Sequence, residues 1–153
     1  MIQHYFKFLF FKLKATNQHA VHSPFLYALV CFCFYNKEWK SKKFKPWNSK
    51  KHDLTAISIV ERLHLFTKQA SIDFQIDTPK VMHTQNKALA QWTKELNIKD
   101  EPHITLIDNL HLQRDAWDAF RNSSGYVVLD FYFYGIIIHR PQQTAETFFL
   151  KVF

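Results

Sequence analysis

The stretch that decides the fold is Ile104-Thr105-Leu106-Ile107-Asp108-Asn109-Leu110-His111. It begins with a short, mostly apolar run that predicts a buried strand, and the residues after it, Gln113 to Arg121, have the pattern of a helix. In an open α/β sheet, ligands bind beyond the carboxyl ends of the strands. The polar pair Asp108-Asn109 therefore marks the place where a functional site would lie in an α/β fold.

A second strand of this kind is expected earlier in the chain, at Ile72–Ile76. Asp77 follows it, and Thr78-Pro79 then predicts the start of a helix that continues to Trp92. Two strand ends that each carry a carboxylate are the most informative functional feature of the sequence.

The rest of the chain predicts helices before this region and strands after it. Residues 2–14 have apolar side chains at three- and four-residue spacings, typical of an amphipathic helix. Ser23-Pro24 predicts the start of a second helix, and residues 54–68 have the apolar stripe of a third. The tail, Tyr126–Ile138, is rich in β-forming residues, and Gly135 is expected just after a turn between two strands.

The composition predicts one folded domain over residues 1–153, because 47% of the residues are hydrophobic and general disorder is thereby excluded. Within this domain we expect N-terminal helices at 1–35, a basic aromatic loop at 36–52 and an α/β core at 53–153.

The formal charge of +7 is compatible with a solvated basic face, or with contact to nucleic acid, anionic lipid or an acidic partner. Part of this charge lies in the basic aromatic loop, where Lys42, Lys43 and Lys45 precede Trp47. Lysines interleaved with aromatic residues can bind single-stranded nucleic acid through phosphate contacts and base stacking. The alternative is a solvated loop whose aromatic rings pack against the domain.

Cys31 and Cys33 are too close along the chain to pair readily with each other, which favours a reduced, cytoplasmic protein and inert thiols in an apolar run. The apolar blocks at residues 5–13 and 25–35 are too short to span a bilayer. For the helix at residues 2–14, peripheral contact with a membrane is the alternative to packing on the core.

Two segments resemble a known family. The tail that contains Asp130, Gly135 and Arg140 resembles the last two strands of class I S-adenosylmethionine-dependent methyltransferases. The segment Asn17–Phe25 resembles the opening motif of a group of these proteins common in Bacteroidetes, with Ala20 where that group usually has glycine.

The resemblance implies a shortened, Rossmann-like sheet of about four strands. Ile72–Asp77 is similar to the family's fourth strand, and Ile104–His111 is similar to its fifth. The implied strand order is 4-5-7-6, with the last strand antiparallel. The strand at 72–76 then becomes an exposed edge, which the helix at 53–68 or a second chain would cover. That chain would be a homodimer partner or an intact methyltransferase.

The cofactor-binding half of the family is missing from the sequence. Only residues 53–70 are available where the first strand, the Gly-rich loop and the acidic residue of the second strand should lie, and they predict one helix. The only glycines, Gly125 and Gly135, lie too far apart to form a Gly-rich loop. We therefore expect no bound S-adenosylmethionine.

The resemblance also suggests a metal site. Catechol-type members bind a divalent cation through residues that match Asp77, Asp108 and Asn109, and such oxygen ligands suit Mg²⁺ or Ca²⁺. The same residue types are ordinary turn and capping residues at strand ends, which is the competing interpretation. His111 is a candidate general base.

Together these features predict a degenerate methyltransferase-like protein that acts as a non-catalytic binding or partner subunit. Two alternatives stay open. One is an active O-methyltransferase completed by a partner chain, and the other is a nucleic-acid or anionic-surface binder that uses Lys37–Lys51.

Overall fold

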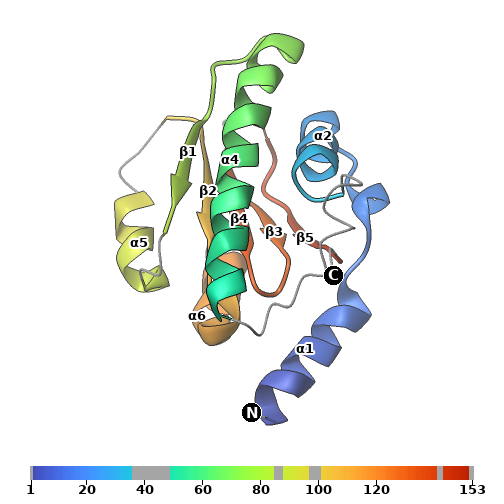
Figure 1. The fold of residues 1–153 in the computed structure, drawn as a ribbon, viewed down its shortest axis with the longest axis vertical. Helices are drawn as coiled ribbons and strands as arrows, with labels where there is room; N and C mark the ends of the chain where they lie inside the picture. The colour runs from blue at the N-terminus through green and yellow to red at the C-terminus, as the bar shows by residue number, and fades with distance from the viewer. Residues whose placement is uncertain (1, 36–48, 85–87, 97–100, 141–142, 152–153) are drawn as a thin grey trace.

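The computed structural model describes residues 2–35, 49–84, 88–96, 101–140 and 143–151, and they form three layers (Figure 1). The described helices are α1 (Ile2–Lys14), α2 (Pro24–Cys33), α4 (Ser49–Asp73), α5 (Leu89–Leu96) and α6 (Arg114–Ser123). Short 3₁₀ turns are η1 (Gln18–Ala20) and η2 (Leu110–Leu112). The strands are β1 (Lys80–His83), β2 (His103–Ile107), β3 (Val127–Asp130), β4 (Gly135–His139) and β5 (Thr147–Phe149).

The strands form a mixed five-stranded sheet in the order β1-β2-β4-β3-β5. β1 is parallel to β2, and β5 is parallel to β3, whereas β4 is antiparallel to both β2 and β3. The antiparallel position of β4 between β2 and β3 agrees with the expectation. The expected number of strands and the full order do not, because the first strand is a different segment and β5 was not foreseen.

The strand expected at Ile72–Ile76 is wrong. α4 continues through this region to Asp73, and the amide of Phe74 donates to the carbonyl of Ala70 at 2.9 Å in a last helical turn. Gln75 then takes a left-handed backbone conformation, with φ of 51°, which ends the helix. Ile72 lies on the exposed side of the helix, whereas Phe74 and Ile76 follow the helix and pack partly buried against the core.

The helix expected from Thr78-Pro79 is also wrong in its first part. β1 occupies this position, and the amide of Lys80 donates to the carbonyl of Pro102 at 3.0 Å as the strand joins β2. Helix begins only at Leu89, in α5. Proline suits the start of a strand as well as the start of a helix, and tertiary pairing with β2 decides between them.

The two faces of the sheet are covered by different helices, as Figure 1 indicates for α4 and α2 on one face. Buried residues of α1, α2 and α4 form a single core with one set of strand side chains, which includes Ile104, Leu106 and Ile136. The strand side chains on the other face of the sheet, such as Val128 and Ile137, pack with residues of α5 and α6. Successive strand residues point to opposite faces, so a strand buried on both faces, such as β4, is mostly apolar.

Two local predictions are confirmed. The side chain of Ser23 accepts a hydrogen bond from the amide of Leu26 at the start of α2, with Pro24 in the first turn. Gly135 begins β4 after the turn that follows β3. No helix in the described part of the chain has the length and hydrophobicity needed to cross a membrane.

Candidate functional site

The strand end that the sequence singles out is a closed polar cluster. Asp108 follows β2 and is only 2% exposed. Its Oδ2 lies 2.9 Å from Nε2 of His83, and its Oδ1 accepts a hydrogen bond from the hydroxyl of Thr84 at 3.0 Å. The amide of Asp108 donates to that same hydroxyl at 3.4 Å. Both carboxylate oxygens are thus used to join the carboxyl ends of β1 and β2.

Asn109 supplies the turn that follows this cluster. Its φ of 51° and ψ of 29° place it in the left-handed region, just before η2. Asparagine adopts this conformation more readily than most residues that carry a side chain. The Asp108-Asn109 pair therefore has a structural explanation at each position: a carboxylate that joins two strands, and a residue that turns the chain.

The structure does not bring the three suggested metal ligands together. Asp77 is exposed and precedes β1, whereas Asp108 follows the end of β2. Because β1 and β2 are parallel, the two carboxylates lie at opposite ends of the strand pair. Among the residues that the structure describes, no group of three or more His, Cys, Asp and Glu is arranged to hold a metal ion.

His111 lies in η2, with its ring centroid 5.1 Å from that of Phe133. Phe133 belongs to the turn between β3 and β4, and its carbonyl accepts a hydrogen bond from the amide of Leu110 at 3.0 Å. The imidazole is therefore packed against the buried turn. The suggested anion-binding residues, Lys42, Lys43, Lys45 and Trp47, lie outside the described residues.

The cysteines differ in their surroundings. Cys33 is buried in the core at the end of α2, and burial raises the pKa of its thiol to about 12, although the positive charge of Arg62 acts in the opposite direction. A thiol with such a pKa stays protonated at neutral pH and is a poor nucleophile. Cys31 is half-buried on the same helix.

A second buried polar cluster surrounds Asp130, at the end of β3. Arg114 of α6 donates to its two oxygens in a bidentate pair, at 2.9 Å each. Nε1 of Trp117 donates to Oδ2 at 3.0 Å, and the amide of Tyr132 donates to Oδ1 at 2.8 Å. Burial acts to lower the pKa of Arg114, but the hydrogen bonds and charge of Asp130 outweigh it and raise that pKa. This cluster fixes α6 and the β3–β4 turn to the sheet.

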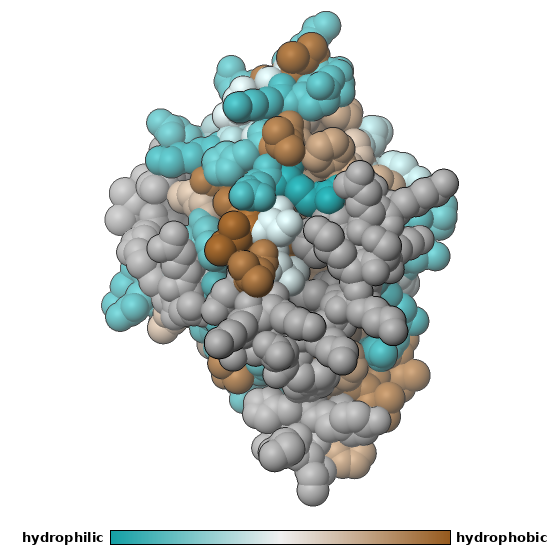
Figure 2. Space-filling model, viewed as in Figure 1, coloured by the Kyte–Doolittle hydropathy of each residue, from teal (hydrophilic) through white to brown (hydrophobic). Residues whose placement is uncertain are grey.

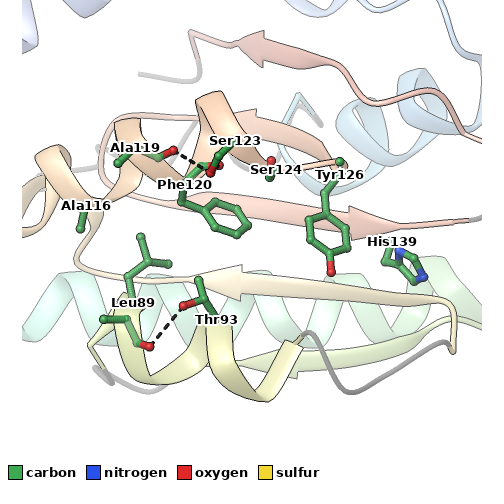
Figure 3. A pocket seen from close by; sticks show the side chains of 11 residues that line it. Leu89, Thr93, Ala116, Ala119, Phe120, Ser123, Ser124, Tyr126 and His139 are labelled. Atoms are coloured by element: carbon green, nitrogen blue, oxygen red, sulfur yellow. Dashed lines mark hydrogen bonds between the residues drawn. The ribbon is translucent and has the colours of Figure 1, made fainter.

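A pocket of about 730 Å³ lies between α5 and α6, as Figure 3 shows. Phe120, Tyr126 and His139 lie side by side along one wall, and Leu89 and Thr93 of α5 project from the other. The rings of Phe120 and Tyr126 are stacked with centroids 6.2 Å apart, and the rings of Tyr126 and His139 meet edge to face at 5.3 Å. The pocket is thus an aromatic surface facing a helix.

This pocket lies away from the strand end that the sequence indicates. Tyr126 precedes β3, and His139 pairs with His103 at the start of β2, whereas Asp108 follows the other end of β2. The Tyr126 hydroxyl and the His139 imidazole are the polar groups of this aromatic wall. A mostly apolar site with a few polar groups suits a flat aromatic molecule.

Sequence reasoning missed the partners of Asp108 and the residues of the pocket. Placing a strand at β1 would have brought His83 and Thr84 beside Asp108, since parallel strands end at the same edge of a sheet. The pocket residues come from α5, α6, the turn before β3 and β4, and nothing in their spacing marks them. Comparison of the chain with protein-family models, with curated proteins and with solved structures gives no match.

Proposed function

We propose that this chain is a non-catalytic binding subunit built on a methyltransferase-like sheet, and that it acts by joining a partner chain. The observation that supports this proposal best is the state of Asp108. A carboxylate that orients a substrate or a metal ion needs an accessible oxygen atom, and both oxygens of Asp108 are instead bonded to His83 and Thr84 in a buried position.

The segment before β1 supports the same proposal. α4 occupies residues 49–73 as one continuous helix without glycine, and it packs against β1 and β2. In the family that the sequence resembles, a strand and a Gly-rich loop at this position hold the cofactor. A helix over the face of the sheet provides no equivalent loop of backbone amides.

The partner surface that we propose is the outer edge of β1. This strand ends the sheet, with β2 on one side and no described strand on the other. The amides of Lys80 and Thr84 donate to β2, at 3.0 and 3.1 Å. Because backbone groups alternate along a strand, those of Val81 and His83 point away from β2. An unpaired edge of this kind can accept a strand from another chain.

Sedimentation of the full chain over a range of concentrations tests the edge. We expect a concentration-dependent dimer in the wild type, or a heterocomplex with an intact methyltransferase, and its loss in Val81→Pro. Proline at this position removes an outward amide but no hydrogen bond to β2. Val81→Ala is the matched control, because it removes the side chain and keeps the amide, and it should still associate.

A wild-type chain that stays monomeric at every concentration and binds no added methyltransferase would overturn the partner role. So would a Val81→Pro variant that is folded by circular dichroism and associates as tightly as Val81→Ala. Binding of S-adenosylmethionine only in the presence of a partner would instead favour an active enzyme that two chains complete.

A further inference from the structure

The outer face of α1 is an exposed apolar surface that the proposed function does not use. Its side chains are Phe6, Leu9, Phe10 and Leu13, which are 54%, 45%, 64% and 75% exposed. Figure 2 shows hydrophobic surface over this helix, at the lower right of the molecule. Large apolar side chains grouped in this way are uncommon on proteins that do not bind another surface.

The opposite face of α1 fixes how the helix is rotated. Phe11 is buried, and its ring lies 5.4 Å from Tyr132 and 6.1 Å from Phe149. Phe8 meets Tyr132 edge to face at 4.8 Å. These contacts hold the inner face against the β3–β4 turn and β5, so the outer face cannot turn inward.

Lysines border the apolar face on both sides. At about 100° per residue, Phe6, Leu9, Phe10 and Leu13 occupy an arc of about 100°, with Lys12 beyond one side and Lys14 beyond the other. Both lysines are exposed. Lys7 lies on the same side as Lys14, and its ammonium group is 2.7 Å from Asp115. α1 contains no Asp or Glu.

We propose that α1 docks this protein on the surface of an anionic lipid bilayer, with the outer face in the interfacial region. Apolar side chains flanked by lysines are the pattern of helices that lie in a membrane interface, because the lysine stems run along the apolar layer and the ammonium groups reach the phosphates. A second copy of the chain fits this face less well. Pairing two α1 helices would place lysines against lysines in a chain of formal charge +7.

The test is co-sedimentation of the full chain with vesicles of phosphatidylcholine alone, and of phosphatidylcholine mixed with phosphatidylglycerol. We expect the wild type to bind the anionic vesicles. In Phe10→Glu/Leu13→Glu we expect the apparent affinity to fall by at least about tenfold, because charged side chains replace the apolar ones that contribute to membrane binding. Leu54→Glu/Leu65→Glu is the matched control. These residues are similarly exposed on α4, and the variant should bind like the wild type.

A third variant, Lys42→Glu/Lys43→Glu/Lys45→Glu, separates the helix from the basic segment of the sequence. Retained binding in Phe10→Glu/Leu13→Glu together with lost binding in this lysine variant would overturn the proposal and assign the affinity to general electrostatics. A wild-type chain that stays in the supernatant with anionic vesicles would also overturn it. So would concentration-dependent self-association that Phe10→Glu/Leu13→Glu abolishes while vesicle binding is unchanged.

Discussion

Gly135 shows at the level of one residue how tightly the second face of the sheet is packed. A Cβ atom placed on Gly135 would lie 2.5 Å from Cη2 of Trp117, whereas one on Gly125 would meet nothing within 4 Å. We expect Gly135→Ala to lower the free energy of unfolding by about 1–3 kcal/mol through overpacking. Gly125→Ala should change it by less than about 0.5 kcal/mol. Urea denaturation measures both, and equal effects would contradict this packing.

Asp130 is the residue on which the second polar cluster depends. Its removal leaves Arg114 buried without its bidentate partner, and leaves Nε1 of Trp117 and the amide of Tyr132 without their acceptor. We expect Asp130→Ala to reduce stability by about 3–5 kcal/mol, as for other broken buried ion pairs. Asp118→Asn is the control, since Asp118 is 3.5 Å from the same arginine but its side chain is 44% exposed, and it should cost less than about 1 kcal/mol. A loss below about 1 kcal/mol in Asp130→Ala would show that the cluster contributes little.

At the level of elements, the sequence correctly predicts a helix start, a strand and a turn that depend on neighbouring residues. The N-cap of α2, the strand β2 and the turn before Gly135 depend on residues next to one another, and each is confirmed. The run Ile72–Ile76 does not form the expected strand, because a short apolar run fits a strand as well as a helix end with the turn that follows it. Only packing of α4 against α2 and the sheet decides between them.

The candidate site was less predictable than the fold, for a related reason. Asp108 was correctly placed at a strand end, but its partners belong to a strand that was assigned to the wrong residues. The Asp130 cluster and the aromatic wall of the pocket join residues from several elements. Their chemistry depends on tertiary distances, which no spacing in the sequence records.

At the scale of the whole molecule, the two segments that carry the family resemblance meet in space. The guanidinium group of Arg140, in the tail, lies 4.0 Å from the ring centroid of Phe25, in the N-terminal motif. Burial lowers the pKa of this arginine. The contact joins the start of α2 to the residue after β4, so the two motifs together stabilise one part of the structure.

The central proposal is that this chain binds a partner and does not carry out methyl transfer. Isothermal titration of the full chain with S-adenosylmethionine tests it most directly, with circular dichroism to show that the protein is folded. We predict no saturable heat, because residues 49–73 form one helix without a Gly-rich loop and both carboxylate oxygens of Asp108 already have bonding partners. Saturable binding of S-adenosylmethionine to the chain alone would contradict the claim.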